Sequence, residues 1–309
     1  MMQIVEVGPR DGLQNEAVVM ATGQKVRFIE QLVAAGAGRI EIVSFAHPGR
    51  VPQMADAEAV AQHFAGRDDF SRIGLVMNER GWQRSQHVEL DEINIPVGAT
   101  AGFNQANVGA TPAATIEFIA TVAAQAEVPV TGTISVAFGC PYEGEVAEDT
   151  VASIASRLAA AGCAEIAVAD TIGVADPWTV RSRLEAVRAV TGEVPLRVHF
   201  HDTRHTGIAN TFAAIDAGIE VLDASVGGIG GCPFAPNATG NIATDDLVYM
   251  LHRAGLPTGL DLQRLVAISQ WIGEELAITP PSALLRAGDF PASPGAEPST
   301  PSTRRARSR

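Results

Sequence analysis

Val33-Ala34-Ala35-Gly36 is followed closely by Arg39-Ile40-Glu41-Ile42-Val43, and the same kind of junction occurs twice more in the chain. In each copy the glycine suits the left-handed residue that ends a helix, and the apolar run suits a buried strand. The junction therefore predicts helix–strand units that repeat along the chain. The other two copies are Leu158-Ala159-Ala160-Ala161-Gly162 before Glu165-Ile166-Ala167-Val168-Ala169, and Ile215-Asp216-Ala217-Gly218 before Val221-Leu222-Asp223-Ala224.

Similar alternation along the rest of the chain predicts eight strands, apolar almost throughout, as parallel strands buried on both faces are. Eight βα units in about 250 residues favour a closed (β/α)8 barrel, the TIM barrel, over an open doubly wound sheet. We expect the strands at residues 3–7, 39–45, 72–77, 92–97, 130–138, 165–170, 196–201 and 221–226.

The predicted barrel accounts for most of the 309 residues. We expect residues 1–284 to form one domain, with an extra helix at 261–276 after the eighth unit. Residues 285–309 are rich in Pro, Ser and Arg and predict a disordered tail, not a second domain. We interpret the arginines near its end as a solvated terminus and not as a nucleic-acid site.

Composition and charge exclude several classes of protein. A hydrophobic content of 46% with 18% charged residues is typical of a globular enzyme. No apolar run reaches the roughly 18 residues that a membrane helix needs. Residues 1–7 have no basic region of the kind that opens a signal peptide, so we expect a cytoplasmic protein. A net charge of −13 disfavours nucleic-acid binding.

Two histidines end the seventh expected strand, in His199-Phe200-His201-Asp202-Thr203. Residues i and i+2 of a strand point to the same face, so both imidazoles face the mouth of the barrel, where active sites of this fold lie. A single histidine there is usually structural, but a pair followed by a carboxylate that can orient a ring favours a metal. With Asp11 from the end of the first strand and an amide oxygen, the set suits Mg²⁺, Mn²⁺ or another six-coordinate divalent ion.

A glycine-rich loop at residues 227–241 follows the eighth expected strand. One interpretation is a phosphate-binding loop, which TIM barrels often have at this place. The other is a mobile lid whose lone thiol, Cys232, transfers a proton. Cys140 and Cys163 complete the set of three free thiols. We expect Cys140, in a Cys-Pro turn, to be structural and Cys163 to be buried.

Seven segments, in order along the chain, resemble the 3-hydroxy-3-methylglutaryl-CoA (HMG-CoA) lyase family. The resemblance runs from residue 4 to about residue 276, and matches at consistent spacing over this length are far more specific than one short motif. The segments are 7–16 (VGPRDGLQNE), 51–56 (VPQMAD), 139–144 (GCPYEG), 170–174 (DTIGV), 199–203 (HFHDT), 230–241 (GGCPFAPNATGN) and 243–251 (ATDDLVYML).

The resemblance implies a retro-Claisen cleavage of HMG-CoA to acetyl-CoA and acetoacetate, a step of leucine degradation, in a homodimer that binds an acyl-CoA. It assigns the metal, Mg²⁺ or Mn²⁺, to Asp11, His199, His201 and Asn241. Asp11 and His199 would thereby belong to the catalytic set as well.

The same resemblance gives roles to the other site residues. Arg10 would stabilise the enolate of the departing acetyl-CoA, and Glu41 would hold Arg10 in place. Gln14 and Asp170 would lie at the substrate, beside Arg10. Cys232 would deliver or remove a proton.

Lys25 is the only lysine in the chain. An aldolase that forms a Schiff base needs a desolvated lysine inside the barrel. Lys25 falls in the first expected helix, on the outer ring, so the sequence excludes that mechanism and leaves metal-assisted cleavage.

The chain departs from the family pattern where the acyl group and the CoA phosphates would bind. Ala17 and Gln105-Ala106 stand where lysines are usual, and Arg50 or Arg204 is the remaining candidate for supplying positive charge there. Thr100-Ala101 replaces a Ser-Glu pair, and Arg204-His205-Thr206-Gly207 stands where a Tyr-Gly-Gln run is usual.

Three other functions stay open at this point. A lyase for another branched 3-hydroxyacyl-CoA, such as citramalyl-CoA, would keep every catalytic residue and change only the pocket. A condensing enzyme of the isopropylmalate synthase kind shares the Arg-Asp pair and the His-x-His, although the loop around Cys232 is more similar to the lyases. A non-catalytic binding barrel is disfavoured by the intact ligand set with Arg10 and Cys232.

Overall fold

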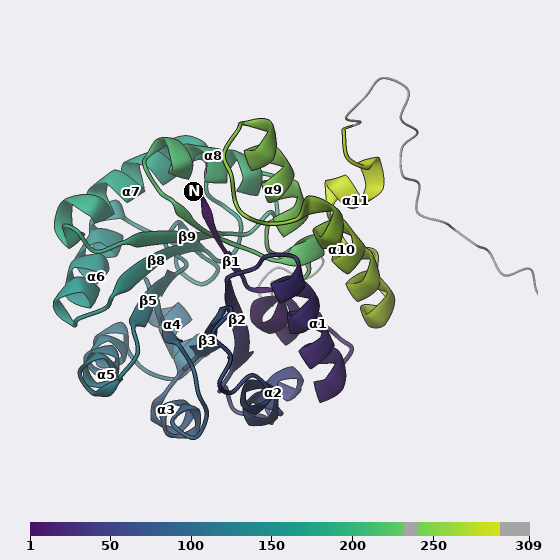
Figure 1. Cartoon of the computed structure of the whole chain (residues 1–309). Helices are drawn as coiled ribbons and strands as arrows, with labels where there is room; N and C mark the ends of the chain where they lie inside the picture. Colours follow the sequence, from purple (N-terminus) through teal and green to yellow (C-terminus); the bar gives the residue numbers. More distant parts are fainter. Residues whose placement is uncertain (232–239, 291–309) are drawn as a thin grey trace, which may run out of the picture.

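A closed barrel of parallel strands forms the centre of the molecule, and helices surround it (Figure 1). The computed structural model describes residues 1–231 and 240–290. The strand order around the barrel is β1-β10-β9-β8-β5-β4-β3-β2, which closes on itself. The expected (β/α)8 barrel is therefore confirmed.

The bounds of the elements follow the predicted alternation closely. The barrel strands are β1 (Gln3–Glu6), β2 (Arg39–Ser44), β3 (Ser71–Leu75), β4 (Glu92–Gly98), β5 (Val130–Ser135), β8 (Glu165–Asp170), β9 (Leu196–Phe200) and β10 (Val221–Ala224). A short antiparallel hairpin, β6 (Gly139–Cys140) and β7 (Gly144–Glu145), follows β5. The helices are α1 (Thr22–Ala34), α2 (Ala57–His63), α3 (Glu79–Ser85), α4 (Ala101–Val108), α5 (Pro112–Gln125), α6 (Glu148–Ala160), α7 (Pro177–Thr191), α8 (Gly207–Asp216), α9 (Thr244–Arg253), α10 (Leu262–Leu276) and α11 (Ala283–Ala287).

The three glycines of the repeated junction adopt the left-handed backbone that the sequence predicts. Gly36, Gly162 and Gly218 have φ values of +95°, +87° and +84° after α1, α6 and α8. At Gly36 a side chain would also have no room, because its Cβ would lie 2.4 Å from the carbonyl oxygen of Gly259. These glycines turn each helix back toward the next strand.

Three of the expected strands end two or more residues early. The strand expected at 72–77 is β3, which ends at Leu75. We expected β5 to extend to residue 138, but it ends at Ser135 because Val136 takes a φ of +50°, outside the extended region. We expected the last strand to extend to 226, but β10 ends at Ala224 and a short 3₁₀ turn (Val226–Gly228) follows. The boundary expected after residue 284 falls inside α11, which continues to Ala287.

The inside of the barrel holds charged side chains below the mouth. Arg39 donates to both Glu92 and Glu165 at the start of the strands. Arg197, 1% exposed, has its Nε 3.4 Å from Glu165 Oε1 and 3.3 Å from Asp223 Oδ1. Charged groups of opposite sign are thus paired within the barrel, as burial of charge requires.

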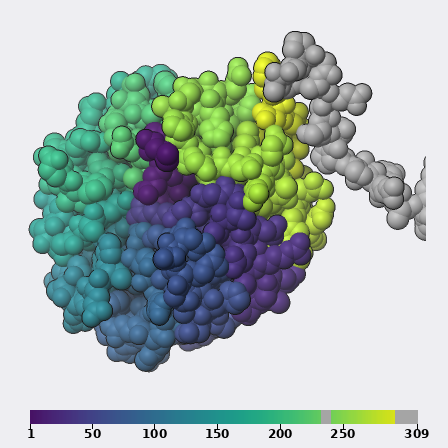
Figure 2. Space-filling model, in the orientation of Figure 1, coloured from purple at the N-terminus to yellow at the C-terminus, as the bar shows by residue number. Residues whose placement is uncertain are grey.

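The N-terminal residues lie at the surface near the middle of the face shown in Figure 2, next to the C-terminal helices. The C-terminal helix α10 packs against α1 and α9 on the outside of the ring. Within the described residues, no helix is both long and apolar enough to cross a membrane.

Candidate active site

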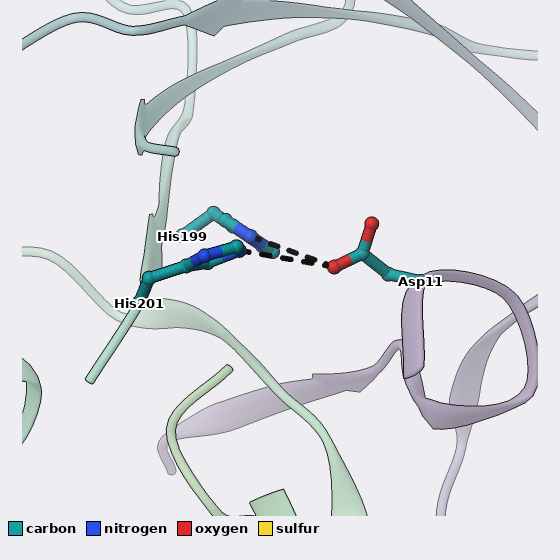
Figure 3. Close-up of side chains that lie close together, drawn as sticks. All are labelled: Asp11, His199 and His201. Carbon is teal, nitrogen blue, oxygen red and sulfur yellow. Dashed lines mark ion pairs between the residues drawn. The ribbon is translucent and has the colours of Figure 1, made fainter. Parts of the chain in front are cut away.

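Asp11, His199 and His201 lie together at the mouth of the barrel, as the sequence predicts (Figure 3). Asp11 lies on a π-helical turn (Gly8–Gly12) that begins directly after β1, and the histidines lie at the end of β9. The Nε2 atoms of both imidazoles are 3.9 Å from Asp11 Oδ2. One ligand atom from each residue lies within 4.8 Å of the other two, so the three side chains form a cluster able to hold one metal ion.

His199 is oriented by a carboxylate from the neighbouring strand. Its Nδ1 lies 3.1 Å from Asp223 Oδ2 on β10. With Nδ1–H donating to Asp223, Nε2 faces Asp11. The sequence suggested that the carboxylate following the histidines, Asp202, would do this; instead Asp202 accepts the backbone N–H of Gly207 at 2.8 Å, at the start of α8.

The charges of the cluster are set by burial and by close neighbours. Burial and the adjacent His199 lower the pKa of His201 to about 3, so His201 is a neutral imidazole at physiological pH. Burial alone would raise the pKa of Asp11, but Arg10 and the imidazoles outweigh it and hold this pKa well below its usual range. An ionised carboxylate beside a neutral imidazole is the protonation state in which both side chains bind metals.

Arg10 lies between two carboxylates. Its Nε donates to Glu41 Oε2 at 2.6 Å, and it also forms ion pairs with Glu41 and with Asp11. Glu41 is 1% exposed on β2, and Arg10 is 9% exposed on the π-helical turn. Glu41 and Arg10 are therefore in direct contact, as the family resemblance implies.

Asn241 lies beside Asp11, and its Nδ2 donates to Asp11 Oδ2 at 2.9 Å. It also forms an isolated β-bridge with His201, which fixes the backbone of the two residues relative to each other. Cys232, the expected proton-transfer residue, lies outside the described residues, together with the rest of segment 232–239. The other two cysteines, Cys140 and Cys163, are each 4% exposed, so the predicted burial of Cys163 is confirmed and Cys140 is buried as well.

A cavity of about 770 Å³, which includes its open mouth, contains the cluster. Gln14 lines it as expected, and its Oε1 is buried with no hydrogen-bond partner among the described residues. Asp170 is not part of the wall, because its carboxylate accepts the backbone N–H groups of Val174 and Ala175 at 3.0 and 2.9 Å. The lining residues are Arg10, Asp11, Gln14, Asn15, Leu75, Met77, Asn94, Pro96, Phe103, Asn107, Thr133, Ser135, Ala169, Thr171, His199, His201, Asp223 and Gly231.

Sequence reasoning missed several polar side chains of this cavity, among them Asp223, Asn94 and Thr133. Each lies within a barrel strand and not in the loop after it. The one available signal was a carboxylate in an otherwise apolar strand, Val221-Leu222-Asp223-Ala224. In a strand buried on both faces, such a residue has to find a partner inside the barrel.

Known proteins of this fold match the chain over nearly its whole length. A family model described as HMGL-like matches residues 1–272. An (R)-citramalyl-CoA lyase of Chloroflexus aurantiacus is 41% identical over 298 residues, covering 92% of this chain and 94% of that protein. A hydroxymethylglutaryl-CoA lyase of Bacillus subtilis is 38% identical over 286 residues, covering 92% of this chain and 96% of that protein.

Two solved structures of such enzymes are similar to this one. A Bacillus subtilis HMG-CoA lyase aligns with a TM-score of 0.89 at 38% identity, covering 92% of this chain and 97% of that one. An HMG-CoA lyase of an Acinetobacter, solved with coenzyme A and 3-methylmalate, aligns with a TM-score of 0.90 at 35% identity, covering 96% and 97%. The chain therefore belongs to the HMGL-like family and is a carbon–carbon lyase.

Proposed function

We propose that this enzyme cleaves HMG-CoA to acetyl-CoA and acetoacetate in a reaction that depends on a divalent metal. The observation that carries the proposal is the position of Arg10, a buried cation beside Asp11 and the two histidines. That arrangement provides a binding site for a hydroxyl-bearing carbon next to a positive charge for the enolate.

The chemistry of the donor set fits a divalent ion. Asp11, His199 and His201 offer one carboxylate oxygen and two imidazole nitrogens. Mg²⁺ binds its ligands at about 2.0–2.1 Å, so ligand atoms about 3–4 Å apart suit a single ion. Asn241, adjacent to Asp11, is the fourth proposed ligand. When bound, Mg²⁺ or Mn²⁺ would polarise the substrate's hydroxyl and lower its pKa.

Arg10 then acts as the carbon–carbon bond breaks. The hydroxyl group of the substrate passes its proton to a base, for which the Cys232 thiolate is proposed; the carbon that bears it becomes a carbonyl, and the electrons of the broken carbon–carbon bond pass into the thioester as an enolate. The Arg10 guanidinium, held by Glu41, meets that negative charge, which exists only in the transition state and the product. Gln14, whose amide oxygen has no hydrogen-bond partner within residues 1–231 and 240–290, is proposed to contact the acyl group.

Cys232 is proposed to protonate the enolate carbon, which yields acetyl-CoA. Support comes from its place in the sequence, directly after Gly231, which lines the cavity. Asp170 is proposed to act on the substrate only indirectly, since its carboxylate caps the backbone of residues 174 and 175.

A lyase for citramalyl-CoA is the second candidate, and the similarity to the Chloroflexus enzyme favours it. The two substrates differ by one methylene between the hydroxyl-bearing carbon and the free carboxylate, so the same catalytic groups serve either. Arg10 is the only lysine or arginine among the described residues of the cavity wall. The binding of the free carboxylate of either substrate would therefore depend on the metal or on neutral hydrogen-bond donors.

Kinetic comparison of the two thioesters tests the proposal. Purified protein with Mg²⁺ is expected to release acetyl-CoA from HMG-CoA with a kcat/KM at least about tenfold above that for citramalyl-CoA. A pocket that fits one substrate usually discriminates by about this factor against a substrate that differs by one methylene. The reverse ratio would assign the enzyme to citramalyl-CoA, and no release from either would contradict the proposal.

The resemblance also supports a cytoplasmic homodimer acting in leucine degradation. Light scattering after size-exclusion chromatography should give a mass of twice the 32.3 kDa of the chain. A mass of one chain would contradict the dimer and leave the chemistry untouched.

A further inference from the structure

A continuous chain of hydrogen bonds connects Arg10 to the wall of the barrel. Arg10 donates to one oxygen of Glu41, and the other oxygen, Oε1, accepts from Asn94 Nδ2 at 2.8 Å. Asn94 Oδ1 in turn accepts from Thr133 Oγ1 at 2.7 Å. The three supporting side chains come from three different strands, β2, β4 and β5. Arg10 is therefore tied to the most rigid part of the fold.

Each side chain in this series of hydrogen bonds has only one orientation in which it can bond to its neighbour. A carboxylate can only accept, so the Asn94 amide has to turn its NH₂ toward Glu41. The amide oxygen then faces Thr133, whose hydroxyl has to donate to it. The Thr133 hydroxyl thereby selects one of the two amide orientations, and the amide fixes the rotation of the Glu41 carboxylate.

Burial makes the arrangement costly to break. Glu41 is 1% exposed and Asn94 is 3% exposed, so neither can replace a lost partner with bulk water. Arg10 also has a competing carboxylate, Asp11, on its other side. If the Glu41 carboxylate rotated freely, the guanidinium would be free to follow Asp11 toward the metal ligands and away from its position at the cavity.

We propose that Asn94 and Thr133 are positioning residues, which act through Glu41 to hold the Arg10 guanidinium where the enolate forms. The proposal rests on the function proposed above for Arg10. Both residues also line the cavity, so direct contact with substrate is the competing explanation, and the two predict different kinetics.

Three substitutions test the kinetic part. Asn94→Leu removes both hydrogen bonds, and Thr133→Val removes the one that orients the amide. We expect kcat to fall by about 10- to 100-fold in Asn94→Leu and about tenfold in Thr133→Val, with KM changed less than about twofold. Thr133→Ser, which keeps the hydroxyl, should recover most of the loss. A raised KM with an unchanged kcat would make these residues substrate contacts and overturn the proposal.

The chain offers a matched control on the same strand. Thr131 lies two residues before Thr133, and its hydroxyl donates to Glu165 Oε1 at 3.2 Å, near the start of the barrel. Thr131→Val deletes the same atom from the same strand but leaves the connection to Arg10 intact. It should lower the melting temperature about as much as Thr133→Val and leave kcat near the wild-type value. Equal losses of kcat in both variants would mean a general loss of packing and would overturn the proposal.

A readout without substrate separates this proposal from the proposed function. In ¹⁵N NMR spectra, the Nε–H signal of Arg10 can be identified by its absence in Arg10→Lys. The Nε proton of Arg10 should exchange slowly with water in wild type and in Thr133→Ser. The same proton should exchange fast in Asn94→Leu. Slow exchange in Asn94→Leu would overturn the positioning role even if turnover fell. If wild type cleaved neither thioester, the proposed function would fail, while this measurement would still decide whether Asn94 holds Arg10.

Discussion

Arg10 is the residue whose role the geometry defines most narrowly. It is buried, it keeps its charge beside Asp11 and Glu41, and it faces the cavity that holds the histidines. A cation fixed in this way stabilises charge that develops in the reaction more than charge already present in the substrate. Its contribution should therefore appear in kcat.

We predict that Arg10→Met lowers kcat by about 100- to 1,000-fold and changes KM little. Arg72→Met is the matched control, because Arg72 is equally buried but pairs with Asp91 at the start of β3. Arg72→Met should lower the melting temperature and leave kcat unchanged. Steady-state kinetics with melting curves would show both; a raised KM alone in Arg10→Met would make Arg10 a substrate-binding residue.

Cys232 should be the thiol that reacts first. Cys140 and Cys163 are buried, and burial raises the pKa of the Cys163 thiol to about 11, which lowers its reactivity further. Mass spectrometry after brief alkylation should find the label on Cys232, and a substrate analogue should slow the reaction. Cys232→Ser should keep metal binding and lose most turnover. Earlier labelling of Cys140 or Cys163, or near wild-type turnover in Cys232→Ser, would count against its role.

The candidate metal ligands could be predicted from sequence because Asp11 directly follows a strand and the two histidines stand as a pair at the end of another, where side chains of a parallel barrel converge. Asp11, His199 and His201 are of this kind. Asn94 lies in the middle of β4, and Asp223 stands at the end of β10 as a single carboxylate with no motif around it, so neither could be predicted in the same way. Local sequence also does not tell which side chains meet inside the barrel. Their roles follow from contacts between strands.

At the scale of elements, one buried carboxylate holds together the segments that carry the site. Glu6, at the end of β1, accepts the N–H of Gly8 at 2.8 Å, the N–H of Val226 at 3.0 Å and the hydroxyl of Thr244 at 2.7 Å. It thus joins the turn of Asp11, the segment after β10 and the start of α9. Burial nevertheless raises the pKa of Glu6 to about 7, although these hydrogen bonds act in the other direction.

The raised pKa predicts how stability depends on pH. The folded state binds the Glu6 proton more tightly than the unfolded chain, so this contribution is complete below about pH 4.5 and is lost as the pH rises through 7. Glu6→Gln, which cannot ionise, should gain stability relative to wild type over that window, by about 3 kcal/mol at most. Urea titrations between pH 4.5 and 8, with chelator present, would measure the difference, and a difference independent of pH would contradict the prediction.

The elements themselves were largely predictable, and the exceptions have local causes. The repeated glycine junctions and the apolar runs located all eight barrel strands. The prediction extended β5 too far because Val136 favours strands by composition, yet here it has a φ of +50° and its N–H bonds the Thr171 hydroxyl at 2.8 Å. A contact from the next strand's loop thus overrides the local preference.

For the molecule as a whole, the balance of charge bears on the binding of CoA. The chain has a net charge of −13, and α4, which contributes Phe103 and Asn107 to the cavity, has exposed neutral residues at Gln105 and Ala106. The phosphates of the proposed CoA thioester substrates are anionic, so a neutral surface at α4 would attract them only weakly.

Gln105→Lys combined with Ala106→Lys should therefore lower KM for the CoA thioester and leave KM unchanged for a pantetheine thioester that lacks the phosphates. The effect should shrink as ionic strength rises, because exposed charges are screened. Steady-state kinetics at low and high salt would test it. Equal improvement for both thioesters would show that the lysines act on the acyl pocket instead.

Metal-dependent cleavage is tested most directly by following acetyl-CoA release from HMG-CoA by purified enzyme before and after chelation, with metal binding measured by calorimetry. The account predicts that chelator abolishes release, that Mg²⁺ or Mn²⁺ restores it, and that His201→Ala weakens metal binding because one of the proposed ligands is lost. Full activity of metal-stripped enzyme in excess chelator would contradict the account.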